Sequence, residues 1–279
     1  MIIDGESIAQ NYITHLKRDS DALKKKGIVP GFGILLVGDD PASHLYVSMK
    51  LVLARKLGFY CRRVLLASSA SEKEILQKLN QLQEDQRIHG VIIQLPLPQH
   101  ILFKNVSKAI DRRKDIDCLN PNNLKLLKKG SKPVFLPPTA ESVTELIDST
   151  GTKLKNKKIV LVGRGFFAHQ IAALCIAKGA RVSLISSSGI HSSRAIRQAD
   201  IVVSAVGKAR IVKGDYVKKG VVVIDVGTSK QGGKTVGDVD MQSVMPKARA
   251  VSPVPGGVGP VTVSMLMKNV VRAAKALTK

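Results

Sequence analysis

Tyr46 and Lys50 are the side chains in the first half of the sequence whose types and spacing best suit chemistry. Pro41 and Ser43 are typical of a helix start, and the apolar periodicity that follows predicts a helix over residues 42–58. A spacing of four residues places the tyrosine ring and the lysine amine on one face of that helix. An aromatic ring beside an amine of tunable pKa can bind a flat ligand and move protons near it. A boundary tyrosine next to a solvated lysine is the simpler alternative, which the pair alone does not exclude.

A glycine-rich loop in the second half of the chain predicts a dinucleotide site. Gly163, Gly165 and Ala168 match the pattern G-x-G-x-x-A, between an apolar strand at 158–162 and a helix at 170–178. The glycines allow a tight turn and a close approach of the backbone to a pyrophosphate, which the N-terminus of the helix then stabilises. A glycine turn that binds nothing is the alternative interpretation of this loop.

The strand that follows the glycine loop favours NADP over NAD. An NAD site usually carries an acidic residue about 20 residues past the loop, where it holds the ribose hydroxyls. Residues 185–189 contain no acid, so nothing there repels the additional phosphate of NADP, and Arg164 and Ser187 could bind it. Arg164 could instead be an ordinary surface arginine.

Strand-like apolar runs alternate with helical patterns along almost the whole chain. This alternation is typical of an open, mostly parallel α/β sheet. Strands are expected at residues 31–37, 60–66, 90–95, 158–162, 181–185, 200–204 and 221–225. Helices are expected at residues 42–58, 72–82, 139–149, 170–178 and 261–277.

The order of these elements predicts two α/β domains, the second a doubly wound Rossmann-type dinucleotide-binding domain, with a cleft between them. A chain of 279 residues is long enough for two domains. The first domain would comprise residues 1–138 and the second residues 139–260. The C-terminal helix, residues 261–279, would pack back on the first domain.

The composition is that of a basic protein with ample material for a packed core. Hydrophobic residues make up 44% of the sequence, and 44 Lys and Arg against 21 Asp and Glu give a formal net charge of +23. This excess favours anionic partners such as nucleic acid, phosphate-bearing cofactors or polycarboxylates. The basic residues are scattered, however, and few aromatic residues are available to stack on bases. We therefore expect no specific nucleic acid partner.

Cysteine usage and hydropathy predict a cytoplasmic protein. Cys61, Cys118 and Cys175 lack CxxC spacing and metal-ligand neighbours, so we expect neither a metal site nor a disulfide framework. The start of the chain lacks the pattern of a signal peptide. No run of about 18 apolar residues is present to span a bilayer, and no membrane association is expected.

Several segments beyond these motifs recur together in one enzyme family. The most specific are Pro41-Ala-Ser43 with Tyr46 and Lys50, Gln94-Leu-Pro-Leu-Pro98, and Pro253-Val-Pro-Gly-Gly-Val-Gly-Pro-Val-Thr262. The others are Ile3-Asp-Gly5, Lys114-Asp-Ile-Asp117, Gly163-Arg164, residues 199–207, and Val236-Gly-Asp-Val-Asp240. On these residues the sequence resembles the bifunctional methylenetetrahydrofolate dehydrogenase/cyclohydrolase family over nearly its whole length.

The resemblance implies a two-step interconversion of one-carbon tetrahydrofolates. Methylenetetrahydrofolate would be oxidised by NADP to the methenyl cation, which water would then open to formyltetrahydrofolate. Lys50 would be the central cyclohydrolase residue, positioning or activating water and managing its proton, and Gln94 would hydrogen-bond Lys50. Tyr46 would stack against the folate ring system, and Asp117 would anchor the pterin end.

The resemblance also implies two sets of binding residues and a cellular setting. Cofactor-binding residues would be Gly163, Arg164, Gly165, Ser187, Val206, Gly207 and Thr228. The substrate would contact Tyr46, Asp117 and the turn Pro255, Gly256 and Gly257. Residues 1–138 would then be a folate-binding catalytic domain and residues 139–260 an NADP-binding domain. We further expect a cytoplasmic homodimer whose products enter one-carbon metabolism and purine biosynthesis.

Three segments depart from the family pattern. Pro137-Pro-Thr-Ala-Glu-Ser142 stands where the family usually has Pro-Cys-Thr-Pro-x-Gly, Cys118 replaces a glycine, and His169 lies in an altered cofactor loop. The altered loop leaves open an enzyme that is mainly a cyclohydrolase with weakened or lost dehydrogenase activity. The net charge leaves a more remote alternative, a basic nucleic-acid-binding protein on an α/β scaffold.

Overall fold

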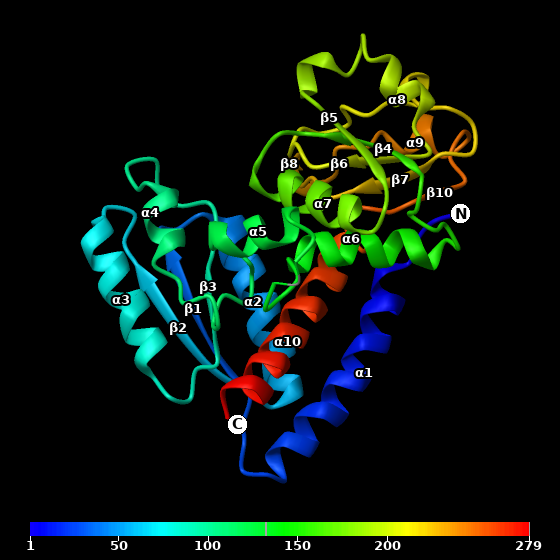
Figure 1. The fold of residues 1–279 in the computed structure, drawn as a ribbon. Coiled ribbons are helices and arrows are strands. Elements are labelled where there is room, and N and C mark those ends of the chain that lie inside the picture. Colours follow the sequence, from blue (N-terminus) through cyan, green and yellow to red (C-terminus); the bar gives the residue numbers. More distant parts are fainter. Residues whose placement is uncertain (132, 279) are drawn as a thin grey trace. The chain divides into compact units, whose positions relative to one another are not determined.

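Two parallel sheets organise the chain, each within its own compact unit (Figure 1). The computed structural model describes residues 1–131 and 133–278. One unit, here the three-stranded unit, comprises Asn11–Pro138 and Val263–Lys279. The other, the five-stranded unit, comprises Met1–Gln10 and Thr139–Thr262.

The sheet of the three-stranded unit has the order β2-β1-β3 with all strands parallel. Its strands are β1 (Gly31–Val37), β2 (Tyr60–Leu66) and β3 (Gly90–Ile93). Every residue of β1 is buried, as expected for a central strand covered on both faces. An isolated parallel bridge joins Val91 of β3 to Asp115, so the chain near Asp115 runs beside β3.

Helices cover both faces of this sheet. Helices α1 (Gly5–Lys24), α2 (Pro41–Leu57) and α10 (Val258–Leu277) share one core with β1, whose members include Leu16, Leu57, Ile34 and Leu266. Helix α3 (Glu72–Glu84) contacts all three strands and lies on the other side of the sheet in Figure 1. The short helices α4 (Phe103–Lys108) and α5 (Pro121–Lys128) precede and follow the Asp115 segment.

Local sequence signals set both ends of α2, the helix that carries Tyr46 and Lys50. The Asp40 carboxylate caps the N-terminus by accepting a hydrogen bond from the Ser43 backbone N–H at 2.8 Å, and Pro41 occupies the first turn. Gly58 ends the helix in the left-handed conformation, with φ of 68°. The helix therefore lies within one residue of the predicted range at each end.

The sheet of the five-stranded unit has the order β10-β7-β6-β4-β5, again all parallel. Its strands are β4 (Lys158–Val162), β5 (Arg181–Ile185), β6 (Ile201–Ser204), β7 (Val222–Asp225) and β10 (Ala250–Val251). The chain proceeds from β4 to β5 on one side and then returns to β6 on the other. This reversal makes the sheet doubly wound, with its switch point beside β4.

Helices also cover both faces of the second sheet. Helices α6 (Pro138–Ser149) and α7 (Phe166–Ala177) lie on one side in Figure 1, opposite α8 (Arg194–Gln198) and α9 (Met241–Val244). Two 3₁₀ turns, η1 (Ser187–Gly189) and η2 (Gly214–Tyr216), interrupt the connections. An antiparallel hairpin, β8 (Ser229–Gln231) with β9 (Lys234–Val236), follows β7.

These observations confirm the predicted class of two α/β sheets, the second one doubly wound. Helix α7 begins at Phe166, four residues before the predicted start at residue 170, because Gly165 already serves as its N-cap. Helix α1 and the β8–β9 hairpin were not predicted from the sequence. No helix in the described part of the chain is long and apolar enough to cross a membrane.

Replacement of Ser71 by alanine should lower the free energy of unfolding by about 1 kcal/mol. The Ser71 hydroxyl accepts a hydrogen bond from the Glu74 backbone N–H at 3.2 Å, and Glu74 accepts one from the Ser71 backbone N–H at 2.8 Å. The change removes half of this capping box at the start of α3. Urea denaturation followed by circular dichroism measures the loss.

Ser69→Ala is the matched control, because Ser69 is exposed in the turn just before α3. Its unfolding midpoint should stay at the wild-type value. Equal midpoints for Ser71→Ala and Ser69→Ala would contradict the stabilising role of the cap.

Candidate functional site

Lys50 and Gln94 meet at the carboxyl end of the three-stranded sheet. Lys50 lies on α2, which follows β1, and Gln94 directly follows the neighbouring strand β3. The Lys50 Nζ donates a hydrogen bond to Gln94 Oε1 at 2.9 Å, as the resemblance implies. Gln94 Nε2 in turn donates to the Leu95 carbonyl at 2.7 Å. The amide is thus oriented with its oxygen toward the lysine.

Burial sets the charge balance between Lys50 and Asp117. Removal from water lowers the pKa of Lys50, and the Asp117 carboxylate acts in the opposite direction. Burial likewise raises the pKa of Asp117, and the Lys50 charge opposes that rise. Each group therefore favours the charged form of the other in a setting that disfavours both charges. An amine held in this way can take up and release a proton near neutral pH more readily than an exposed lysine.

Tyr46 precedes Lys50 by one helical turn on α2 and is half-buried. Lysine, tyrosine, glutamine and aspartate therefore all belong to the three-stranded unit. The group combines an aromatic surface, a proton-exchanging amine and a carboxylate suited to a ligand rich in N–H donors.

A buried carboxylate that sequence reasoning missed supports the Asp117 segment. Asp115 is fully buried and accepts hydrogen bonds from the backbone N–H of Leu119 at 2.8 Å and of Asn120 at 2.9 Å. It also accepts one from the Asn123 side chain at 2.6 Å. Burial raises the pKa of Asp115 to about 6. Its place in Lys114-Asp-Ile-Asp117, two residues from Asp117, was the available signal.

The residues expected to bind the cofactor lie at the carboxyl ends of four neighbouring strands in the five-stranded unit. Gly163, Arg164 and Gly165 follow β4, and Ser187 follows β5. Val206 and Gly207 follow β6, and Thr228 follows β7. In an open α/β sheet, ligands bind at this edge beside the switch point.

The glycine loop leaves room for a phosphate group. Gly163 has φ of 123°, and a Cβ there would lie 2.6 Å from the Ala205 carbonyl oxygen, so a larger residue would force β4 and β6 apart. Gly165 is the N-cap of α7, and a Cβ there would meet open space. The N-terminus of a helix, where the dipole and the backbone N–H groups favour an anion, suits a pyrophosphate. His169 is exposed on α7 and does not fill this space.

The end of β5 presents hydroxyl groups and no carboxylate. Ser186 caps the η1 turn, and its Oγ lies 3.0 Å from the Ser188 Oγ. Ser187 is half-buried, and Arg164 is exposed. This donor set fits a phosphate better than it fits a pair of ribose hydroxyls.

The turn Pro255-Gly256-Gly257 belongs to the five-stranded unit. Gly256 has φ of 96°, and its carbonyl accepts a hydrogen bond from the Gly5 backbone N–H at 3.0 Å. A Cβ on Gly257 would lie 2.4 Å from the Pro253 carbonyl oxygen. The glycines are therefore required by backbone packing, whatever else approaches the turn.

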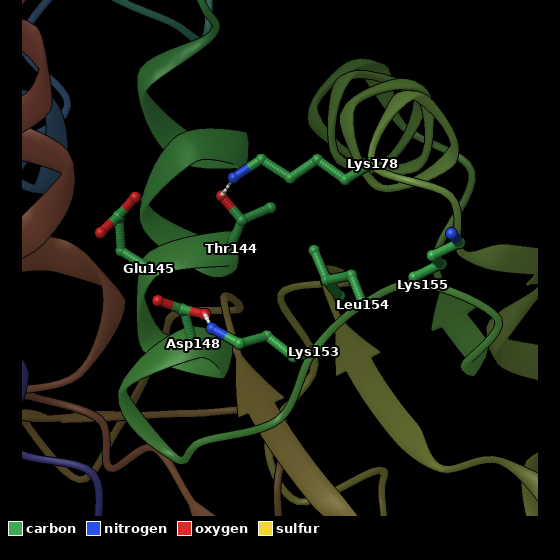
Figure 2. Close-up of a pocket in the computed structure, with 7 residues that line it drawn as sticks. All are labelled: Thr144, Glu145, Asp148, Lys153, Leu154, Lys155 and Lys178. Atoms are coloured by element: carbon green, nitrogen blue, oxygen red, sulfur yellow. Dashed lines mark hydrogen bonds and ion pairs between the residues drawn. The ribbon is translucent and has the colours of Figure 1, made fainter.

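A surface hollow elsewhere on the five-stranded unit contains none of the expected site residues. Figure 2 shows Lys178 reaching Thr144, to which it donates a hydrogen bond at 3.1 Å, and Lys153 pairing with Asp148 at 3.1 Å. Its remaining lining residues are Glu145, Leu154 and Lys155. The hollow is lined by the residue just after α7 and by the residues just before β4. It therefore lies at the amino edge of the sheet. Among the described residues no cluster of His, Cys, Asp and Glu is placed to hold a metal ion.

Two family models match the chain and together cover most of it. Residues 3–117 match the catalytic domain of tetrahydrofolate dehydrogenase/cyclohydrolase. Residues 137–278 match the NAD(P)-binding domain of the same enzyme. The "Bifunctional protein FolD" of Pelobacter propionicus is 41% identical over 276 residues, which cover 98% of this chain and 97% of that protein.

Solved structures agree with the sequence comparisons. The bifunctional FolD methylenetetrahydrofolate dehydrogenase/cyclohydrolase of Campylobacter jejuni is 34% identical, with a TM-score of 0.93 and 99% of each chain covered. The Trypanosoma brucei enzyme, solved with NADP cofactor and an inhibitor, is also 34% identical. Its TM-score is 0.95, and the match covers 100% of this chain and 98% of that one.

Asp117→Asn should lower the pKa of Lys50 further below its usual value. The change removes the carboxylate charge that opposes the effect of burial. A ¹³C NMR titration of labelled lysine side chains, with Lys50 assigned by its absence in Lys50→Met, measures the shift. Asp39→Asn is the control, since the Asp39 side chain is 87% exposed. An unchanged or higher pKa of Lys50 in Asp117→Asn would contradict the coupling.

Proposed function

Because the chain belongs to the tetrahydrofolate dehydrogenase/cyclohydrolase family, we propose that it interconverts one-carbon tetrahydrofolates in two steps. Methylenetetrahydrofolate is oxidised with NADP to methenyltetrahydrofolate, and the methenyl compound is hydrolysed to formyltetrahydrofolate. The observation that carries this proposal is the half-buried Lys50, whose amine is bonded to Gln94 and electrostatically coupled to Asp117.

We propose that Lys50 manages the proton of the hydrolytic water. Water adds its oxygen to the methenyl carbon and loses a proton, which the neutral amine can accept. The carbon–nitrogen bond then breaks as the hydroxyl of the adduct becomes the formyl carbonyl and releases its proton to solvent, and the amine can return the first proton to the departing nitrogen. Burial favours the neutral amine that the first proton transfer needs, and Gln94 holds it in place. Asp117 is suited to the donor-rich edge of a pterin, and Tyr46 to its flat face.

We propose that the carboxyl edge of the five-stranded sheet holds NADP. When bound, NADP supplies the acceptor for the hydride that leaves the methylene carbon. The glycine loop and the start of α7 would hold the pyrophosphate, and Val206, Gly207 and Thr228 would line the neighbouring strand ends. Arg164 and Ser187 would bind the additional phosphate. The Trypanosoma brucei relative was solved with NADP, which supports this choice of cofactor.

We also propose that the two halves of the chain bind different ligands. Residues 1–138 with the helix 261–279 would bind folate, and residues 139–260 would bind NADP. The family descriptions of residues 3–117 and 137–278 support this assignment. No observation favours the cyclohydrolase-only alternative or the nucleic-acid-binding one. A homodimer that supplies purine biosynthesis is proposed on the family resemblance alone, and a cytoplasmic location on cysteine usage and hydropathy.

Lys50→Met should reduce hydrolysis of methenyltetrahydrofolate by at least about 100-fold, because a thioether cannot accept and return the proton. Binding of NADP should be unchanged, since the cofactor residues belong to the other unit. Absorbance of the methenyl compound and of the reduced cofactor, followed together with NADP and then with NAD, measures both steps.

Lys56→Met is the matched control, because Lys56 is exposed near the end of the same helix. Its hydrolysis should equal that of the wild type. Retained hydrolysis in Lys50→Met would refute the role of Lys50. Normal hydrolysis in the wild type with no reduction of either cofactor would refute the dehydrogenase half of the proposal.

Arg164→Ser should raise the KM for NADP about 10- to 100-fold, the loss expected for one charge-assisted contact. The KM for NAD should change little, because NAD lacks the additional phosphate. Steady-state kinetics with both cofactors test this. Arg181→Ser is the control, since Arg181 is exposed at the start of β5, at the opposite edge of the sheet. An equal rise for both cofactors would show that Arg164 does not select NADP.

A further inference from the structure

Two buried carboxylates lie beneath the loops that leave β6 and β7 in the five-stranded unit. Asp225 is the last residue of β7 and is 2% exposed. Asp238 follows the β8–β9 hairpin and is fully buried. Ser204, the last residue of β6, is the register partner of Asp225. Both carboxylates therefore sit at the sheet edge where the cofactor residues gather.

Asp238 holds the loop that follows β6. Its Oδ2 accepts hydrogen bonds from the Val206 backbone N–H at 2.7 Å and from the Ser204 hydroxyl at 2.8 Å. Its Oδ1 accepts one from the Lys208 backbone N–H at 2.8 Å. The two backbone donors flank Gly207, which has φ of 76°. One side chain thus fixes the end of β6 and both sides of the glycine.

Asp225 binds the loop that follows β7 and also the backbone at Asp238. Its Oδ1 accepts from the backbone N–H of Gly227 and of Asp238, both at 3.1 Å. Its Oδ2 accepts from the Val239 backbone N–H at 2.8 Å. Gly227 immediately precedes Thr228. The carboxylate of one aspartate therefore positions the backbone of the other, and the two loops are linked through the pair.

Glycines leave the space that the two carboxylates occupy. A Cβ on Gly227 would lie 2.0 Å from the Asp238 carboxyl group, and one on Gly237 would lie 2.0 Å from Asp225 Oδ2. Neither distance is possible for a real side chain, so both positions exclude any other residue without displacement of a carboxylate. Each carboxyl group thus occupies space that a glycine on the opposite segment leaves open.

Burial of two neighbouring carboxyl groups carries a free-energy cost that a purely structural contact would not require. Burial raises the pKa of Asp225 to about 7, and the charge of Asp238 adds to that rise. Desolvation and the neighbouring negative charge thus both disfavour ionisation of Asp225, and groups perturbed in this way concentrate at functional sites. Here the cost is offset by hydrogen bonds from loop N–H groups that have no strand partner.

We propose that Asp225 and Asp238 are positioning residues for the dinucleotide: they hold the loops carrying Val206, Gly207 and Thr228 in the shape that receives it. This inference rests on the proposed function, in which those loops bind NADP. Only an ionised carboxylate meets the requirement, because both of its oxygens then accept and neither donates. An amide would turn an NH₂ group toward one of the loop N–H groups.

Asp238→Asn is the decisive variant, since it keeps size and removes one acceptor. We expect the KM for NADP and the dissociation constant for NADPH, measured by its fluorescence, to rise about 10- to 100-fold. Hydrolysis of methenyltetrahydrofolate, which does not consume the cofactor, should stay near the wild-type rate. Unchanged cofactor affinity, or equal loss of both activities in a variant that unfolds at the wild-type urea midpoint, would overturn the proposal.

Ser204→Ala is a milder second variant that keeps the test decisive if Asp238→Asn does not fold. It removes one donor to Asp238 and should weaken NADPH binding several-fold, on the order of one neutral hydrogen bond. Ser243→Ala is its control, because Ser243 bonds Asp240 and Gly214 away from the pair. Equal NADPH affinity in Ser204→Ala and Ser243→Ala would contradict the proposal.

The NADPH titration separates failure of this inference from failure of the proposed function. If the wild type binds NADPH but does not oxidise methylenetetrahydrofolate, the proposed reaction fails while the variants still test positioning by affinity. If the wild type binds no dinucleotide, the positioning role fails as well. If the wild type does both and the variants match it, only the positioning role is wrong.

Discussion

Parallel strands bring their carboxyl ends to one edge of a sheet, and the loops that leave this edge carry backbone N–H groups without strand partners. Both units satisfy such groups with buried aspartates. Asp115 accepts from Leu119 and Asn120 in the three-stranded unit, while Asp225 and Asp238 accept from five backbone N–H groups in the five-stranded unit. The loops that carry the candidate site residues can therefore keep irregular shapes without losing hydrogen bonds.

Burial is important in both units, because it shifts the pKa values of the ionisable groups that it removes from water. It lowers the pKa of Lys50 and raises the pKa of Asp117, Asp115 and Asp225. In the three-stranded unit the result is an amine able to exchange protons beside a carboxylate. In the five-stranded unit the result is a pair of carboxyl groups whose hydrogen bonds fix the backbone of the loops that follow β6 and β7. The same desolvation thus supports proton transfer in one place and positioning in the other.

Much of the fold could be predicted from local patterns. The all-apolar run of β1, the capped start of α2 and the glycine turn after β4 are contained in a few neighbouring residues, so the sequence revealed them directly. The long helix α1 and the β8–β9 hairpin were missed. The hairpin has only three residues per strand, too few for a clear alternating pattern. Helix α1 is as amphipathic as the predicted helix α3, with Leu16 and Leu23 buried on one face, so its signal was present in the sequence and was overlooked.

The sequence by itself determined the parallel α/β class, the glycine loop and the chemical types of Tyr46, Lys50, Gln94 and Asp117, because each depends on neighbouring residues or on a matching motif. Only the tertiary structure decided which side chains meet. The Lys50–Gln94 bond joins residues 44 positions apart, and the bond from Ser204 to Asp238 joins residues 34 apart. Such pairings depend on which strands lie side by side, and the burial that shifts the pKa values exists only after the sheets and helices have packed.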